Sequence, residues 1–325
     1  MAALSPAATL LHKHTYTLGR SLYIPLTCRC NSTPLPITRG PGFLLPKSIA
    51  DALISVRNVE CGEDRRLDGD GDGEERVAMP NFPKKWLVDC LYENVFEKSP
   101  FQRNVEQECN GSSIGVMDDK IRPSISTLID EVISRLDSDS YDNTPPSPSF
   151  DQVVIAGEGE PTLRMDALLA VSRQIQSHRK ERSEAPLPIR VITNGLVYTV
   201  PNFGYSPYNS KRNGPFPLHR HVVLRDMMEA GISRISVALN TANRHEYDVL
   251  MEPCCYSSGR TMPGTAHDMV CEFILEAAKV GMEVEITGID RPDVDKVETD
   301  RLARLLLSVA DKSKRSKVRW RKYFQ

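Results

Sequence analysis

The sequence predicts an α/β protein whose parallel strands form a partial (β/α)6 barrel of the TIM type. Short apolar runs, several of which stop at glycine or asparagine, alternate with longer segments whose apolar residues recur at helical spacing. Small, polar and acidic residues follow the apolar runs, at the ends of parallel strands where barrel proteins gather their chemistry. A chain of 325 residues can bury one core of this size. Periodicity does not decide whether the sheet closes.

Six strands carry the pattern, and each is rich in β-branched or aromatic residues. The first begins near Tyr16 and includes Ser21–Thr27. The run that follows position 151, QVVIA, is apolar throughout and stops at glycines, as a strand buried on both faces does. The remaining strands are predicted at 189–195, 232–240, 282–290 and 317–324.

Helical spacing of apolar residues marks the segments between these strands. Gly231 and Gly281 end two of them and are typical helix stops. Right-handed crossovers through such helices make the strands parallel. The predicted helices span residues 46–58, 84–96, 125–136, 164–176, 218–231, 267–281 and 297–312.

The domain organisation is a single barrel over residues 15–325, preceded by a short tail, 1–14. Residues 59–83 form an acidic, glycine-rich insert that cannot bury enough apolar surface to order itself, so we expect it to be disordered. Residues 137–149 are a Ser/Pro/Asp linker.

Composition restricts the partners and the compartment. The formal net charge is −2, which gives no overall attraction to nucleic acid or to a membrane surface. No apolar run approaches the roughly 20 residues of a membrane helix. The eight cysteines, without a secretory signal, favour reduced thiols and a cytoplasmic protein. No acidic residue precedes Asp51, which leaves mitochondrial import open.

The strand ends are expected to meet around one pocket. Glycine there lets the backbone approach a ligand, and side-chain oxygens and amides supply hydrogen bonds. The residues at these positions are Gly157, Glu158, Gly159, Glu160, Pro161, Thr193, Asn194, Gly195 and Asn240.

These motifs, in this order, resemble the radical S-adenosylmethionine (SAM) superfamily, and within it the proteins associated with TatD-type hydrolases. The segment at 16–27 is similar to the first strand of that group, and GEGEPTL at 157–163 is similar to its second-strand motif. ITNG, SVALN and the closing VRWRKYF also fall in order. The resemblance covers most of residues 16–324.

The resemblance implies a six-stranded partial barrel that binds SAM and a 4Fe-4S cluster. It assigns the acidic side chain and backbone of the GEGEPT motif to SAM's amino group, as carboxylates suit an ammonium. Thr193 and Asn194 suit a ribose edge, Asn240 could line the same cavity, and Arg39 could pair with a carboxylate. A TatD-type metal-dependent hydrolase is the implied partner.

The sequence departs from the family at the cluster motif. Cys30 stands at the first cysteine position, whereas Pro34 and Ile37 occupy the second and third. Iron–sulfur clusters need thiolates, and one cysteine does not hold a cubane. Cys28 is a further possible ligand, and the pair at 254–255 could complete an atypical set.

Three functions therefore remain open. The first in rank is a cluster-free descendant that keeps a SAM pocket as a binding or regulatory module. The second is an active 4Fe-4S enzyme with atypical cysteine ligands. The third is a nucleic-acid or protein adaptor acting through the basic C-terminal run KSKRSKVRWRKYF, although its basic residues alternate with apolar ones as in a half-buried strand. The strand interpretation is preferred, which does not favour a nucleic-acid partner.

Overall fold

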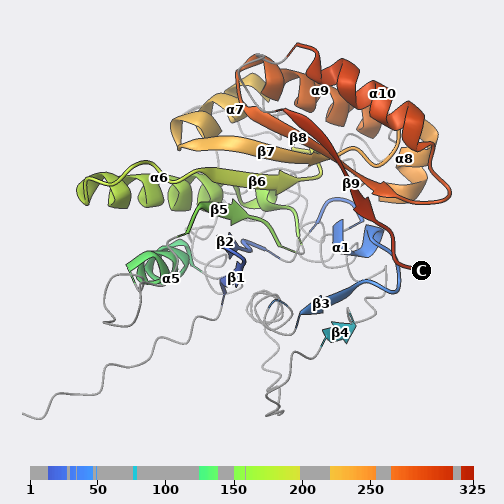
Figure 1. Cartoon of the computed structure of the whole chain (residues 1–325). Coiled ribbons are helices and arrows are strands. Elements are labelled where there is room, and N and C mark those ends of the chain that lie inside the picture. Colours follow the sequence, from blue (N-terminus) through green and yellow to red (C-terminus); the bar gives the residue numbers. More distant parts are fainter. Residues whose placement is uncertain are drawn as a thin grey trace, which may run out of the picture.

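The structure is a computed structural model, described for the following residues: 14–27, 30–33, 35–46, 49, 76–78, 124–137, 150–157, 159–197, 220–253, 265–309 and 316–325. Within these residues the fold is α/β, with one large sheet that curls into a half-barrel (Figure 1).

The large sheet has seven strands in the order β1-β2-β5-β6-β7-β8-β9. From β2 onward every neighbouring pair is parallel, and β1 joins β2 antiparallel at the edge. The strands are β1 (Tyr16–Leu18), β2 (Ser21–Ile24), β5 (Gln152–Ile155), β6 (Ile189–Thr193), β7 (Ile232–Ala238), β8 (Glu283–Asp290) and β9 (Lys317–Lys322). The spatial order of the parallel strands follows the chain, as expected for successive crossovers through helices.

Helices pack on one face of this sheet (Figure 1). They are α5 (Ile125–Asp137), α6 (Met165–Glu181), α7 (Arg220–Glu229), α9 (Thr265–Lys279) and α10 (Lys296–Leu307), with the single-turn η4 (Pro161–Arg164) ahead of α6. The helices α5, α6, α7, α9 and α10 each overlap a segment predicted to be helical, although α6 extends beyond its predicted end at position 176, and η4 was not predicted. The core between the layers is apolar, with fully buried Leu22, Ile155, Val191 and Phe273 among its members. Burial of these side chains is the main favourable contribution to the fold.

The predicted first strand is interrupted. Tyr16–Leu18 and Ser21–Ile24 are two antiparallel strands joined by a tight turn at Gly19 and Arg20. Gly19 has φ +58, a left-handed conformation that glycine adopts without a steric penalty. A continuous strand from position 16 was therefore wrong, because the turn residue outweighed the strand-forming neighbours.

Further elements differ from the prediction. A short helix that was not predicted, α1 (Leu35–Thr38), follows β2. Leu44–Pro46 is the strand β3, so the helix predicted over 46–58 does not begin at Pro46. Arg76–Ala78 is the strand β4, antiparallel to β3, so the insert expected to be disordered contains a three-residue strand. An unpredicted helix, α8 (Arg244–Met251), follows β7.

The signal for α8 was present in the sequence. The Asn243 side chain caps it by accepting hydrogen bonds from the backbone N–H groups of His245 and Glu246. The helix is only eight residues long, too short for a clear apolar period. At the other end of the chain, His14 is buried, although it was assigned to the tail.

Several predictions fall outside the described residues. They concern the tail 1–13, the helix at 84–96, most of the insert, the linker beyond Asp137 and the residues Cys28, Pro34, Glu158, Cys254 and Cys255. Among the residues that the structure describes, no helix is long and apolar enough to span a membrane.

Candidate functional site

The segment from Cys30 to Phe43, which we call the crossing segment, passes over the carboxyl ends of the parallel strands. Near its start, the Asn31 side-chain amide donates to the carbonyl of Leu196, just after β6. The Thr33 N–H donates to the carbonyl of Met251, at the end of α8. Farther on, the Arg39 carbonyl accepts from the Phe324 N–H, just after β9. Because this segment contains Cys30 and Ile37, it places these two positions over the strand ends.

Glu160 is the centre of the polar contacts beneath this segment. Its side chain is almost wholly buried, and the residue lies between β5 and η4. Oε1 accepts from the Thr162 N–H at 3.1 Å and from the hydroxyls of Thr162 and Thr193, both at 2.7 Å. Oε2 accepts from the Asn194 N–H at 2.7 Å. The carboxylate thus fastens the end of β6 to the start of η4.

Burial raises the pKa of the Glu160 carboxyl, opposed by the hydrogen bonds from Asn194, Thr193 and Thr162. No ion pair joins this carboxylate to a cation among the described residues. Oε2 accepts one of the four hydrogen bonds, and a carboxylate oxygen can accept a second. A buried anion with spare acceptor capacity and no counter-charge is an environment that a cationic group would complement.

Asn194 connects Glu160 to the crossing segment. Its Nδ2 donates to Asn31 Oδ1 at 2.7 Å and to Ser32 Oγ at 2.8 Å, and lies 3.7 Å from Cys30 Sγ. Its Oδ1 accepts from the Leu196 N–H. The structure therefore brings Glu160, Thr193 and Asn194 together, and their polar side chains mainly satisfy one another. Their place in a shared ligand pocket stays a prediction.

Asn240 is linked to the same segment indirectly, through Met251. It is buried at the end of β7, and its Nδ2 lies 2.9 Å from Met251 Sδ. The Met251 carbonyl in turn accepts from the Thr33 N–H. Asn240 and Asn194 therefore flank the Asn31–Thr33 stretch and make no direct hydrogen bond with each other.

The predicted glycines and proline shape the turns. Gly157 and Gly159 are half-buried, and Pro161 opens η4, where its lack of an N–H costs no hydrogen bond. Gly195 has φ +81, and an added Cβ would lie 3.0 Å from Val237 Cγ1. Glycine at 195 thus allows β6 to turn tightly into the strand-end loop.

Arg39 is part of a different group of contacts. Its Nε donates to the Lys322 carbonyl at 2.9 Å, and its guanidinium lies over the rings of Phe43 and Phe324. Among the residues that the structure describes, no carboxylate pairs with Arg39, so the predicted carboxylate partner is not found there. Burial lowers the pKa of Arg39, and the charge of Arg319 lowers it further.

The described residues do not fit a 4Fe-4S cluster. The Cys30 thiol is buried and packs against Ser32 and Asn194, and the isoleucine at position 37 has no ligand atom. Among the described residues, no group of three or more His, Cys, Asp or Glu side chains could hold a metal ion. A cubane is held by several thiolates, which the described residues do not supply around Cys30.

Sequence reasoning missed the residues that complete this site. Asn31, Ser32, Thr162 and Met251 hold the crossing segment and the Glu160 turn, and Arg164 donates to the Leu26 carbonyl at the end of β2. For Thr162 the signal was its spacing two residues after Glu160, which is typical of a capped turn. For the others, contacts between segments far apart in the chain give no local pattern.

No protein-family model matches the chain, and the search of curated proteins finds no significant relative.

Proposed function

We propose that this protein is a cluster-free relative of the radical SAM barrels, with a partial (β/α)6 TIM-type architecture, that binds SAM or S-adenosylhomocysteine at the carboxyl end of its parallel sheet. The resemblance in GEGEPTL, ITNG and SVALN suggests the ligand class. The observation that carries the proposal is the buried Glu160 carboxylate, which has no cation paired with it among the described residues.

The amino group of the ligand is the cation that would complement this carboxylate. An ammonium donates up to three hydrogen bonds, and Oε2 of Glu160 retains acceptor capacity for one of them. Charge-assisted hydrogen bonds in a buried setting are stronger than neutral ones, so the pair would offset the cost of burying the carboxylate.

The neighbouring residues then have supporting roles. Gly157 and Gly159 are half-buried and offer backbone groups to the ligand. Thr193 and Asn194 already bond to Glu160, Gly195 and the crossing segment, so they position the carboxylate and form the wall of the site. Contact between their side chains and a ribose would require the Asn31–Thr33 stretch to move.

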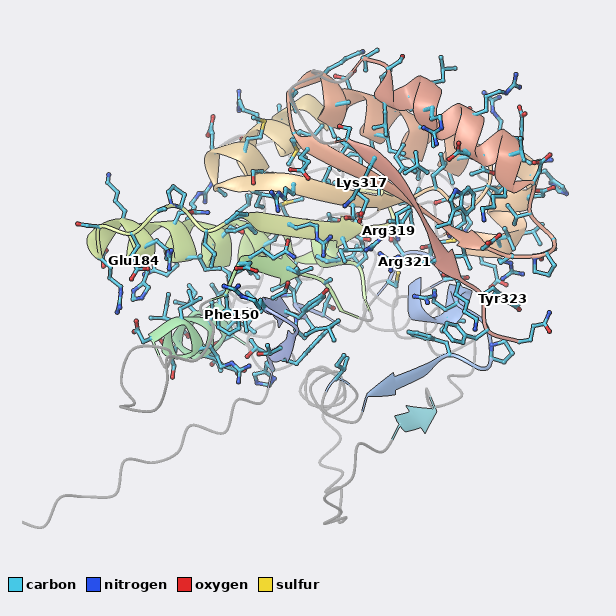
Figure 2. All side chains as sticks on the ribbon, viewed as in Figure 1. Phe150, Glu184, Lys317, Arg319, Arg321 and Tyr323 are labelled. Carbon is cyan, nitrogen blue, oxygen red and sulfur yellow. The ribbon has the colours of Figure 1, made fainter. Side chains whose placement is uncertain are left out.

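Isothermal titration calorimetry with SAM and with S-adenosylhomocysteine tests this function. The wild-type protein should bind at least one of them saturably, and Glu160→Gln, which removes the charge and keeps the side-chain size, should weaken binding about tenfold or more. Glu184→Gln is the matched control, because Glu184 lies on the surface beyond the carboxyl end of α6 (Figure 2). No binding of either compound to folded wild-type protein would refute the proposal.

The cluster-free part of the proposal has its own test. Anaerobic reconstitution with iron and sulfide should leave the protein colourless, with no bound iron after gel filtration. A brown protein with about four irons per chain, absorbing near 400 nm, would instead support the active enzyme with atypical ligands. A TatD-type hydrolase as partner and a cytoplasmic location remain predictions from the resemblance and the composition.

A further inference from the structure

The face of the sheet opposite the helices carries a group of basic side chains. In β9, Val318 packs against the core on the helix side and Trp320 lies against Gly288 and Lys296. Because side chains alternate along a strand, Lys317, Arg319 and Arg321 point to the other face, inside the curl of the sheet (Figure 2). Arg190 of β6 joins them there, and we call these four residues the inner basic cluster.

One carboxylate lies within this cluster. Glu285 of β8 is almost wholly buried, and its Oε2 accepts from the Ser236 hydroxyl at 2.8 Å. Lys317 Nζ and Arg319 Nη2 each lie 3.3 Å from its oxygens, and Arg190 Nη1 lies 3.7 Å away. Burial alone would raise the pKa of Glu285, but the Ser236 hydrogen bond and these cations together lower it. Glu285 is therefore a fixed negative charge that holds three cations around it.

The cluster has more positive charge than this one carboxylate balances. The Arg321 side chain makes no hydrogen bond or ion pair with any described residue, and its buried Nε has no acceptor. The buried Nε of Arg190 also lacks an acceptor. Burying a guanidinium with unused donors costs free energy unless an anion completes it.

The titration of Arg321 reflects the same imbalance. Burial, followed by repulsion from Arg319 and Arg39, lowers the pKa of Arg321 to about 10. Arg39 approaches from the crossing segment, so a fifth cation adds to the field at this point. Arginine is otherwise the most persistently charged side chain in proteins, and this lowering comes first from burial and only then from the neighbouring cations.

We propose that the inner basic cluster is a binding site for a small, multiply charged anion, specifically a phosphate group. The planar forks of Arg190, Arg319 and Arg321 match the paired oxygens of a phosphate, and the unused Nε donors of Arg190 and Arg321 supply hydrogen bonds that no described residue accepts. A dianion reduces the repulsion among these side chains.

The exposure of the side chains indicates a small ligand. Lys317 and Arg319 are 59% and 44% exposed, whereas Arg190 is only 16% exposed. Solvent therefore reaches the cluster at one side, and the donors without acceptors lie deeper, where a single phosphate fits more readily than a polymer backbone. This site is independent of nucleoside binding at Glu160, since the two share no residue.

Thermal unfolding at constant ionic strength, with increasing inorganic phosphate or pyrophosphate replacing chloride, tests the site. The wild-type protein should show a saturable rise in melting temperature, as a ligand that binds only the folded state requires. Arg321→Met, which keeps the length of the side chain and removes its charge, should weaken the apparent affinity about tenfold or more.

Arg304→Gln is the matched control. Arg304 lies on α10, on the helix-covered face of the sheet, and pairs with Asp300 at 2.6 Å, so its loss should leave the phosphate affinity unchanged. A second readout separates a binding role from a structural one. Without added phosphate, Arg321→Met should melt at or above the wild-type temperature, because it removes a buried charge that has no partner.

Two results would overturn the proposal. One is a wild-type protein that unfolds cooperatively but whose melting temperature shows no saturable rise with either phosphate or pyrophosphate. The other is tight binding of a short RNA that inorganic phosphate does not compete with, which would assign the cluster to nucleic acid instead. Both outcomes leave SAM binding at Glu160 to be judged by its own titration.

Discussion

The Glu160 carboxylate accepts the backbone N–H of Asn194 at 2.7 Å, across 34 positions of the chain. This hydrogen bond joins the loop after β5 to the loop after β6, the two turns that carry the GEGEPT and ITNG motifs. The ends of β5 and β6 are thereby connected, and the Asn194 side chain in turn donates hydrogen bonds to Asn31 and Ser32 of the crossing segment.

Replacing Glu160 by alanine should destabilise the fold strongly. Four donors, two from Thr162 and one each from Thr193 and Asn194, would lose their acceptor in a buried setting. We expect a loss of roughly 3 kcal/mol or more, since a hydrogen bond to a charged group contributes about 1.5–3 kcal/mol. Urea unfolding followed by circular dichroism measures it. Thr162→Val, which removes one of the four donors, should cost clearly less, and an equal cost would contradict this account.

Gly195→Ala and Gly281→Ala form a pair that separates strain from a steric clash. Both glycines have positive φ, +81 and +87, so alanine should cost about 1 kcal/mol at each. At Gly195 the new Cβ would also lie 3.0 Å from Val237, whereas nothing lies within 4 Å at Gly281. Gly195→Ala should therefore have the lower urea midpoint. Equal urea midpoints would contradict this, because they would mean that Val237 and its neighbours accommodate the added Cβ without loss of stability.

Glu131 should hold the N-terminal edge of the sheet. From α5, its carboxylate accepts the backbone N–H groups of His14 and Thr15 and the Thr15 hydroxyl. Glu131→Gln replaces one acceptor oxygen by a donor that faces these N–H groups, and we expect a loss of about 1–3 kcal/mol in chemical denaturation. Asp130→Asn, on the exposed side of the same helix, is the control and should change little. Indistinguishable stabilities for the two variants would rule out this role.

Stability should fall as the solution is acidified below about pH 6.5, in part through His267. The imidazole is buried and donates from Nε2 to the Thr241 carbonyl. Burial lowers its pKa from the ordinary value of 6.5, and the Arg244 charge acts in the same direction, although the Thr241 hydrogen bond and Asp268 oppose them. As the pH falls, His267 takes up a proton in the unfolded state before it does so in the folded state. The contribution of His267 to stability is therefore fully present above about pH 6.5 and is lost as the pH falls below that value.

The measurement for His267 is the urea midpoint between pH 5 and pH 8. His267→Gln, which keeps a side-chain N–H donor and cannot gain a charge in this range, should have a flatter profile than the wild type. Matching slopes for the two proteins would show that other groups cause the acid sensitivity.

The order of strands and helices was largely determined by the sequence. Apolar periodicity is a local property, and it identified β5 to β9 and the longer helices α6, α7, α9 and α10 because each buries one face or stripe of its own. The strand ends were predictable for the same reason, since carboxyl ends of successive parallel strands meet at one edge of a sheet. Short elements such as α8 and the β1–β2 turn were missed, because single capping and turn residues decide them.

Only the tertiary structure decided which groups meet across the sheet. The crossing of residues 30–43 from β6 to the end of β9 depends on how far the sheet curls, which no local pattern encodes. The inner basic cluster depends on strand register, because register determines that Lys317 and Arg319 lie opposite Glu285 and Thr287. Composition alone showed a nearly neutral chain, and the fold concentrated four of its cations around a single carboxylate.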